Sequence, residues 1–423
     1  MGETVTAKKS ALGHIRVCDF TGQLAGAGAT RWMASFGAEV IKIEDPVKQG
    51  TWDILRGSPP FKDERRGIEF GSGFQNHNIE KLGITLNLRT DTGKDLLREL
   101  VKVSDVVAEN FAAGVLERLG FGFEQLQELR PDVVYASNCG FGQTGPYRNF
   151  KSWGPIAQAM SGHTHNSGHS GLEPAGWGLS YLDHTGGYYM AIGILLALLH
   201  RQRTGEGQWV DMSCTEAGAY LHGAELLDWS VNGNSLRGTD ARGRAIPASN
   251  RARLEGRAPH GVYQCQGDDN WVAIACRDQQ EWERLRAVAR CDALSDERFD
   301  TIEGRLDHED DLDAAMNVWT KEQIRWDVEQ NCQAAGIPAA AVKRPDERID
   351  GDADTAAWGL WPSVNHEAMG GVRVDGEPVH FSKTDWSINR ATPTLGQDNQ
   401  RVFGDILGLS TSEIEQLTED GVL

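Results

Sequence analysis

Short runs of β-branched and aliphatic residues alternate along the first half of the chain with segments whose apolar residues recur every three or four positions. The runs of the first kind predict strands, and they are IRVCDF, EVIKIE, GITLNL, DVVAEN and DVVYASN. The segments between them predict amphipathic helices, and they include AGATRWMASFG, TGKDLLRELVKVS and FEQLQELRP. Strands that alternate with helices predict an α/β fold with an open, mostly parallel sheet covered on both faces.

A long apolar segment follows, predicting a helix from Asp183 to about Arg203 that ends at Thr204-Gly205-Glu206-Gly207. The strand WVDMSC and one helix, TEAGAYLHGAELLDWSV, are predicted next. A stretch rich in glycine, arginine and asparagine then lacks periodicity and is interpreted as a linker. The last part predicts a hairpin in GVYQCQGDDNWVAIAC, acidic helices to about Gln333, a β-pair in GGVRVDGEPVHFS and a helix in STSEIEQLTEDGVL.

The size and charge of the chain limit what it does. Its 423 residues exceed the roughly 250–300 at which one hydrophobic core stops growing, so two lobes are expected. The formal net charge of -19 comes without a basic face, which argues against nucleic acid as a partner. A small anionic ligand remains compatible, because a few placed cations and backbone N–H groups can hold it.

The cysteines are scattered and never form a C-x-x-C pair, which predicts reduced thiols in a cytoplasmic protein, without disulfides or a metal site. The N-terminus has no apolar signal region. The longest apolar run falls short of the ~20 residues that span a bilayer, so we expect no membrane partner.

A glycine-rich turn after the first strand resembles a dinucleotide-binding turn without completing it. Gly26 and Gly28 fit the pattern, but Arg31 stands where a third small residue is needed for close helix packing. We therefore expect no nicotinamide or flavin site. The free N–H groups of such a turn are still suited to an anionic ligand.

Asp183 has two interpretations. As the first polar residue of a long helix it fits an N-cap, the role that Asp often takes. Alternatively, a carboxylate at such a junction is a nucleophile for an activated acyl group, with Gly186 and Gly187 leaving room for substrate. A proton-transfer pair of Asp183 with His163 or His184 is a third, weaker hypothesis.

Several segments together resemble the family III CoA-transferases, a superfamily that also contains α-methylacyl-CoA racemases. The matching segments are VCDFTGQLAGAGATRWMASFGAEVIKIEDP, NIEKLGITLNLRTDTGKDLLRELV, DVVAENFAAGVLERLGFGFEQLQELRPDVVYASNCGFGQTGPY, QAMSG and YLDHTGGYYMAIGILLALLHRQRTGEGQWVDMSCTEA. The wording around the long helix is most similar to subunits of succinyl-CoA:benzylsuccinate CoA-transferases.

The resemblance implies a function and a site. Asp183 falls on the family's catalytic aspartate, which carries CoA from an acyl-CoA to an acid through an anhydride and an aspartyl-CoA thioester. CoA or acyl-CoA is then a substrate, and no cofactor is permanently bound. The resemblance places CoA contacts on Leu24, Ala25, Leu86, Asn87, Leu88, Arg89, Asn110, Phe111, Arg118 and Lys151, and a substrate pocket at Trp153, Trp177, Gly186 and Gly187.

The resemblance also implies the architecture. It predicts a Rossmann-like large domain in residues 1–225, a linker in 226–258, a smaller α+β domain in 259–345, and a return to the large domain in 346–423. In the family two chains interlock, so we expect a homodimer or a heterodimer with a related subunit.

Departures from the family pattern bear on the substrate. Asp45 stands where a basic residue often contacts a phosphate, and the tetraglycine loop of formyl-CoA enzymes is replaced by RLEGRAPHG, so oxalate is not the expected acceptor. Succinyl-CoA is the candidate donor, and a bulky or aromatic acid is the candidate acceptor.

Two alternatives to a transferase stay open. A racemase would carry GHD.NY before SG, but Trp153 and Gly154 replace its His and Asp. The other alternative is a CoA-binding partner subunit of a heteromeric transferase, against which the presence of Asp183 argues.

Overall fold

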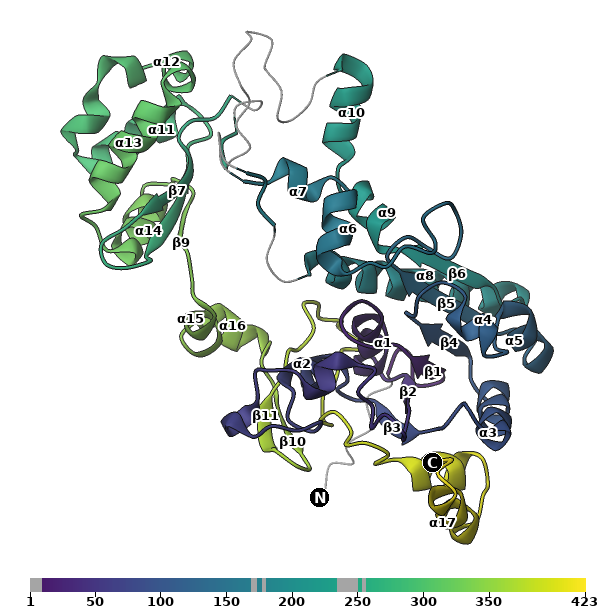
Figure 1. Cartoon of the computed structure of the whole chain (residues 1–423). Coiled ribbons are helices and arrows are strands. Elements are labelled where there is room, and N and C mark those ends of the chain that lie inside the picture. The colour runs from purple at the N-terminus through teal and green to yellow at the C-terminus, as the bar shows by residue number, and fades with distance from the viewer. Residues whose placement is uncertain (1–9, 169–172, 177–179, 234–249, 253–255) are drawn as a thin grey trace. The chain divides into compact units, whose positions relative to one another are not determined.

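The computed structural model describes residues 10–168, 173–176, 180–233, 250–252 and 256–423 (Figure 1). The chain divides into two compact units. The first consists of Met1–His163, Gly176–Gly223 and Asp354–Leu423, and the second of Thr164–Ala175 and Ala224–Ala353.

The first unit is built on a six-stranded sheet in the order β3-β2-β1-β4-β5-β6, in which every pair of neighbours is parallel. The strands are β1 (Arg16–Phe20), β2 (Glu39–Glu44), β3 (Leu82–Thr85), β4 (Val106–Glu109), β5 (Val134–Cys139) and β6 (Trp209–Ser213). This is the doubly wound order, in which the direction of the crossovers reverses between β1 and β4. The α/β prediction with a parallel sheet is confirmed.

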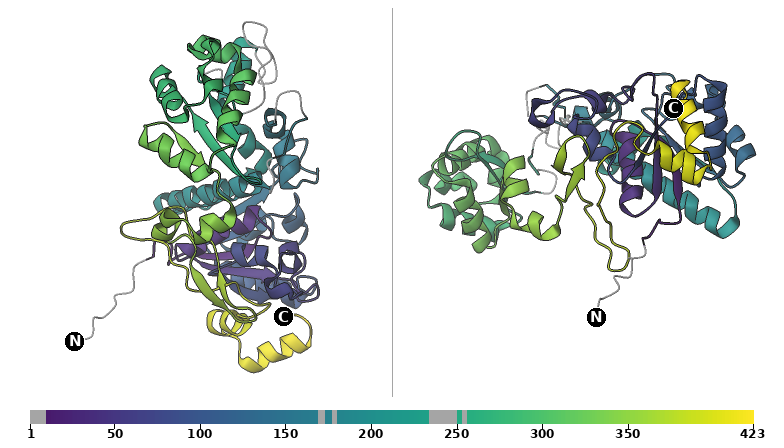
Figure 2. Two further views of the ribbon diagram at one scale, coloured as in Figure 1. Left: turned by 90° about the vertical axis from the view of Figure 1, so that its left-hand side faces the viewer. Right: turned by 90° about the horizontal axis from the view of Figure 1, so that it is seen from below.

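Two apolar layers cover the sheet, because successive strand residues point to opposite faces. Val17 packs with α1 (Ala25–Ser35) and α8 (Tyr181–Thr204) on one face. Cys18 packs on the other face with α3 (Asp91–Lys102), α5 (Phe123–Leu129) and the C-terminal segment. The C-terminal helix α17 (Thr411–Glu419) lies at the edge of this unit in every view (Figure 2).

Shorter elements complete the first unit. They are η1 (Ile54–Gly57), η2 (Lys62–Glu64), α2 (Ser72–His77), α4 (Val115–Arg118), α6 (Gly154–Met160), α7 (His163–Asn166), α9 (Cys214–Tyr220), α16 (Ala353–Trp358), β10 (Ser363–His366), β11 (Gly370–Arg373) and η5 (Gln400–Ile406), with α7 and α16 at its boundaries. The predicted β-pair inside GGVRVDGEPVHFS is wrong, because β11 pairs with the preceding β10.

The second unit contains a small antiparallel sheet in the order β7-β8-β9, with helices around its own core. Its elements are α10 (Gly223–Asn232), β7 (His260–Gln264), β8 (Trp271–Ala275), α11 (Gln279–Ala289), η3 (Asp292–Ser295), η4 (Glu297–Phe299), α12 (Ile302–Asp307), α13 (Glu309–Thr320), α14 (Arg325–Ala334), β9 (Ala339–Ala341) and α15 (Pro345–Asp350). The predicted hairpin is confirmed as β7 and β8.

One continuous helix was expected where α9 and α10 are separate. The backbone tightens after α9, with hydrogen bonds from Leu221 N to Gly218 O and from His222 N to Ala219 O. The His222 ring also packs against His163, with ring centroids 3.9 Å apart. This tight turn ends the helix.

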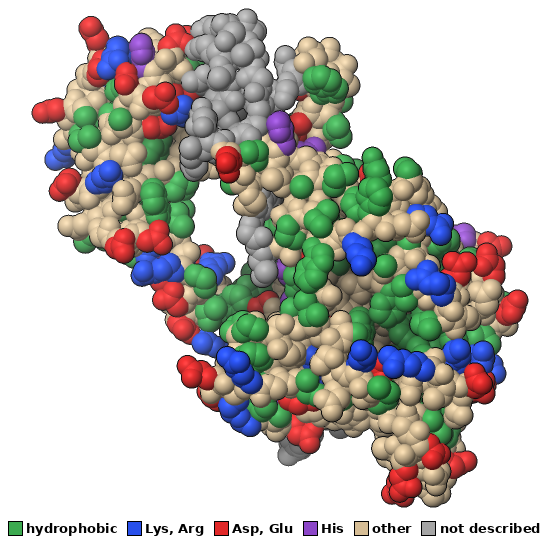
Figure 3. Space-filling model, viewed as in Figure 1, with side chains coloured by type: hydrophobic (Ala, Val, Ile, Leu, Met, Phe, Trp, Pro, Cys, Tyr) green, Lys and Arg blue, Asp and Glu red, His purple; other side chains and the backbone are tan. Residues whose placement is uncertain are grey.

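Helix α8 is long and apolar enough to span a membrane by length and composition, although 44% of the relevant window is buried within the fold. It packs on α1 and α9 as a core helix of the first unit. Figure 3 shows hydrophobic side chains exposed over α6 and α8, including Trp153, Ile192 and Leu196.

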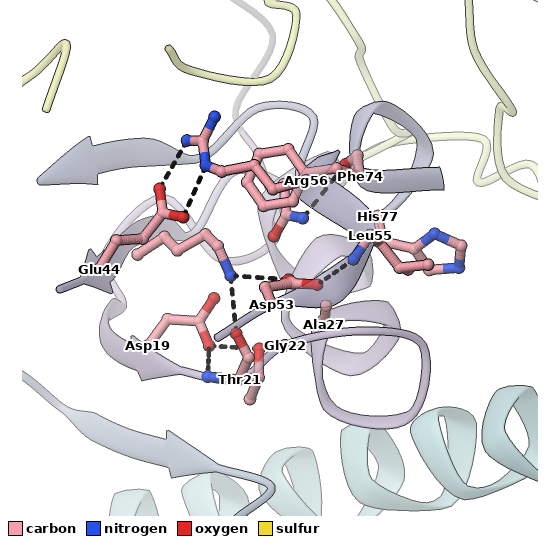
Figure 4. A network of polar contacts seen from close by, with 12 residues as sticks. Asp19, Thr21, Gly22, Ala27, Glu44, Asp53, Leu55, Arg56, Phe74 and His77 are labelled. Carbon is pink, nitrogen blue, oxygen red and sulfur yellow. Dashed lines mark hydrogen bonds and ion pairs between the residues drawn. The ribbon is translucent and has the colours of Figure 1, made fainter. Parts of the chain in front are cut away.

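Buried charges lie beneath the turn that follows β1. The Lys81 ammonium is 3.0 Å from Asp19 and donates to Thr30 and Asn78. Asp19 also accepts hydrogen bonds from the backbone and side chain of Thr21 (Figure 4). Nearby, Arg56 binds both oxygens of Glu44 (Figure 4).

We expect Lys81→Met to lower the free energy of unfolding by about 3–5 kcal/mol, because it leaves the Asp19 carboxylate buried without its cation. Denaturant unfolding followed by circular dichroism measures the change. The exposed pair of Lys102 with Glu99 provides the control, since Lys102→Met should cost less than about 1 kcal/mol. Equal losses in the two variants would contradict the importance of the buried pair.

Candidate active site

Asp183 lies inside the first turn of α8 rather than at its cap. The N-cap is Ser180, whose backbone is left-handed with φ of 34°, and Asp183 N donates to Ser180 O at 2.9 Å. The N-cap interpretation of Asp183 is therefore wrong. Its carboxylate instead accepts hydrogen bonds from the Ser180 side chain and from the backbone N–H of Gly154.

Gly154 allows this approach. It is the first residue of α6, and a Cβ built at this position would lie 2.7 Å from Asp183 Oδ2. Any side chain at residue 154 would therefore displace the carboxylate or its hydrogen bond. Burial raises the pKa of Asp183 to about 6, against the opposing effect of the Ser180 and Gly154 hydrogen bonds.

The Asp183 side chain faces a cavity of about 200 Å³. The wall combines the turn after β1, the ends of β4 and β5, and the starts of α6 and α8. Its residues are Gln23, Leu24, Ala25, Asn110, Asn138, Cys139, Gly140, Ser152, Trp153, Ala157, Asp183 and Cys214. The structure thus brings together five residues that the sequence singled out: Leu24, Ala25, Asn110, Trp153 and Asp183.

This cavity lies at the carboxyl end of the sheet where the strand order reverses, the usual ligand position in open α/β folds. Asn110, directly after β4, holds the turn after β1 through two hydrogen bonds with Gly22, at 2.7 and 2.9 Å. The site is therefore supported across the switch point.

A second cavity of about 230 Å³ lies on the other side of the β4 end. It is mostly apolar and is lined by Phe20, Ile43, Asp45, Trp52, Leu86, Leu88, Arg89, Phe111 and Leu119. Phe111 contacts the Trp52 ring, with centroids 5.2 Å apart. Because Asn110 and Phe111 are consecutive, one stretch of backbone separates this cavity from the one at Asp183.

Arg89 is the cation of the second cavity, and it faces Asp45. The guanidinium is 3.6 Å from the Asp45 carboxylate, and both side chains are partly exposed. The position where the family often places a cation is thus occupied by a carboxylate that neutralises Arg89. An anionic ligand has to compete with Asp45 for it.

Other predicted contacts lie away from both cavities. Asn87 donates to the Gly421 carbonyl near the C-terminus, Arg118 donates to Ala113 O at the end of α4, and Lys151 is exposed just before α6. Trp177 lies outside the described residues.

Gly186 and Gly187 face protein atoms. A Cβ at residue 186 would lie 2.7 Å from Cys214 Sγ, and one at residue 187 would lie 2.7 Å from Ala25 O. Their absent side chains let α8 approach β6, α9 and α1. Close helix packing is therefore a sufficient reason for both glycines, in place of the expected room for substrate.

The histidines near Asp183 have other neighbours. His163 is bonded to Gly218 O, at 3.1 Å from Nε2. The His184 ring contacts His77, with centroids 5.6 Å apart, and burial lowers its pKa. The structure gives no support for pairing either histidine with Asp183.

Sequence reasoning missed the wall residues Gln23, Asn138, Cys139, Ser152 and Cys214 of the Asp183 cavity. Asn138 and Cys139 end strand β5, beside the switch point, and this position was the available signal. Cys214 comes into the site through packing of α9 on α8, which no short sequence pattern reveals.

A parallel sheet with a buried, ionisable carboxylate at its switch point defines an α/β protein with a covalent or acid–base site. The chain also matches the CoA-transferase family III profile over residues 12–399, and it belongs to this family. It is a CoA-transferase.

Curated relatives span almost the whole chain. A formyl-CoA:oxalate CoA-transferase of Streptomyces avermitilis is 31% identical, over 98% of this chain and 99% of its own length. The succinyl-CoA–D-citramalate CoA-transferase of Chloroflexus aurantiacus is 30% identical, over 97% and 98%. The succinate–glutarate CoA-transferase of Agrobacterium fabrum is 30% identical, over 94% and 96%.

Solved structures share the fold. A CaiB/BaiF family protein from Brucella suis superposes with a TM-score of 0.82 at 27% identity, covering 94% of this chain and all of its own. Rv3272 from M. tuberculosis gives a TM-score of 0.75 at 22% identity, over 93% of this chain and 99% of its own.

The burial of Asp183 leads to a stability prediction. Its pKa rises from 3.8 to about 6 on folding, so the unfolded chain loses this proton first as the pH increases. Stability therefore falls between these two values and remains lower above them. We expect Asp183→Asn to raise the free energy of unfolding at pH 7.5 by about 1–3 kcal/mol.

Denaturant unfolding at several pH values measures this gain, which should shrink as the pH is lowered from about 6 towards 3.8. Asp268→Asn, at an exposed turn position, is the matched control and should change stability little. A destabilised Asp183→Asn variant at pH 7.5 would show that the carboxylate is not strained by burial.

Proposed function

We propose that Asp183 is the nucleophile of CoA transfer. Its Oδ atom attacks the acyl carbon of the donor thioester, the C–S bond breaks, and CoA leaves as the thiolate while a mixed anhydride forms. The thiolate then attacks Cγ of Asp183, which releases the donor acid and leaves an aspartyl-CoA thioester. The acceptor carboxylate reverses these steps, so no oxidant or net proton is needed.

The observation that carries this proposal is the carboxylate itself, which is held by Gly154 N–H and Ser180 at the wall of a cavity in a CoA-transferase. A pKa of about 6 leaves it mostly ionised at neutral pH and also more basic than an ordinary Asp. A more basic carboxylate is the better nucleophile. Its two hydrogen bonds keep it aimed while it reacts.

The second cavity is our candidate for the nucleotide end of CoA. Its apolar wall of Phe111, Trp52 and Leu86 suits a planar base, and Arg89 suits a phosphate. Asn110 stands between this cavity and Asp183, so a ligand that passes Asn110 would contact both. Arg118 and Lys151 remain candidates for further phosphate contacts from the protein surface.

We propose succinyl-CoA as a donor, supported by the relatives that are named for succinyl-CoA and succinate. The Asp183 cavity, at about 200 Å³, is smaller than the roughly 300–1,000 Å³ typical of drug-sized ligands, which favours a short acyl group. Trp153 is 59% exposed beside it and could contact a larger acceptor. The aromatic acceptor and the exclusion of oxalate stay predictions for a panel of acids.

The racemase alternative is disfavoured by the site. Gly154 provides a backbone N–H to Asp183 where a racemase has a side chain, and Trp153 replaces the histidine base. We also propose a dimer in the cytoplasm. Its support is the exposed apolar surface of α8, including Tyr188, Ile192 and Leu196.

Incubation with succinyl-CoA and hydroxylamine should convert Asp183 to a hydroxamate, because hydroxylamine attacks both the anhydride and the thioester. Peptide mass spectrometry locates the modification. We expect Asp183→Asn to form no adduct and to lose CoA transfer on the order of 10⁴-fold or more.

Asp268→Asn should keep both the adduct and the transfer rate, since this exposed residue is far along the chain in another unit. An adduct on a different residue, or full activity in Asp183→Asn, would rule out the proposed nucleophile.

The Arg89–Asp45 pair leads to opposite effects on CoA affinity. Arg89→Ala should raise the KM for the CoA donor roughly tenfold, the loss expected for one charge-assisted hydrogen bond. Asp45→Ala should lower it several-fold, because Arg89 is then free of its competing carboxylate. Both effects should shrink at high salt, since the pair is exposed.

Initial-rate kinetics at two salt concentrations measure these changes. Asp95→Ala removes a similar exposed partner, that of Arg98, and should leave the KM unchanged. A higher KM in Asp45→Ala would mean that Asp45 supports the CoA site instead of opposing it.

A further inference from the structure

Asn138 lies in the wall of the Asp183 cavity with an unused hydrogen-bond donor. It is the penultimate residue of β5 and is 1% exposed. Its Oδ1 accepts a hydrogen bond from Cys214 Sγ at 3.2 Å. Its buried Nδ2 has no hydrogen-bond partner among the residues that the structure describes.

The orientation of this amide follows from its neighbour. Burial and the nearby Asp183 carboxylate raise the pKa of the Cys214 thiol well above its usual range, so the thiol keeps its proton and donates. The amide oxygen must therefore face Cys214, and the NH₂ group must face the other way.

The NH₂ group points towards the Asp183 side of α8. Nδ2 lies 3.7 Å from the position that a Cβ of Gly186 would take, in space that the glycine leaves without a side chain. Gly186 follows Asp183 by three residues, and residues with this spacing lie on one face of a helix. The unused donor and the carboxylate thus border the same side of the cavity.

A purely structural role does not account for such a group. A buried donor without a partner costs about 1–3 kcal/mol, and an apolar residue of similar shape would avoid this cost. The neighbouring buried strand residues Val134 and Ala136 are apolar. A destabilising donor beside a reactive carboxylate is typical of a group kept for the reaction.

We propose that Asn138 is a catalytic residue that donates its Nδ2 hydrogen bond to the acyl carbonyl oxygen as Asp183 attacks the thioester. This inference rests on the proposed function of Asp183. Negative charge develops on that oxygen when the carbonyl carbon becomes tetrahedral, and it is removed again when the C–S bond breaks. Asn138 forms no covalent bond and exchanges no proton.

Single-turnover formation of the Asp183 adduct tests the proposal, with succinyl-CoA as the probe and mass spectrometry as the readout. We expect Asn138→Leu, which keeps the approximate shape, to slow adduct formation roughly 10²–10³-fold. The dissociation constant of free CoA should stay the same, because CoA has no carbonyl at the reacting position. The melting temperature should stay equal or rise.

Asn138→Asp is the second variant, since it keeps the shape and replaces the donor with an acceptor. It should be as slow as Asn138→Leu, and it tests the proposal if the leucine variant does not fold. Asn365→Leu, at an exposed position of β10, is the control and should react at the normal rate.

Normal adduct formation in a folded Asn138→Leu or Asn138→Asp variant would overturn the role of Asn138 while leaving the Asp183 nucleophile intact. A rate loss matched by an equal weakening of free CoA binding would also overturn it, because that pattern indicates a distorted site. Failure of the unmodified protein to form any adduct would instead overturn the proposed function together with this inference.

Discussion

The close contact of α8 with α1 determines where the candidate nucleophile lies. Gly187 packs against the backbone carbonyl of Ala25, and a single methyl group there would lie 2.7 Å from that oxygen. Asp183 is one helical turn before this contact, and Leu24 and Ala25 line its cavity. The register of the two helices therefore fixes the distance between the carboxylate and the turn after β1.

The buried charges beneath that turn play a complementary role. Burying Lys81 with Asp19 gives little net stability over an apolar pair, because both ions lose their hydration. What the pair provides is direction, since Asp19 binds Thr21 and Thr30 while Lys81 binds Asn78. Three separate segments are thereby held in one arrangement under the site.

Local patterns were sufficient for much of the fold. Runs of buried residues such as those of β1 and β4 predicted the parallel sheet, and the resemblance placed Asp183, Asn110 and Phe111 beside cavities. The failures depend on tertiary structure. The left-handed backbone of Ser180, the pairing of β11 with β10, and the proximity of Cys214 to Asn138 are all set by contacts between segments distant in sequence.

Gly154 has a consequence for the evolution of this site. The racemases of the superfamily carry a side chain at the corresponding position, but here a Cβ would meet the Asp183 carboxylate. A path from this chain to isomerisation chemistry therefore cannot proceed through single substitutions at 153 and 154 alone. Helix α6 would first have to shift away from α8, and such an intermediate would have neither the aimed nucleophile nor the proton-transfer base. The two activities are separated by a fitness valley that one missing methyl group creates.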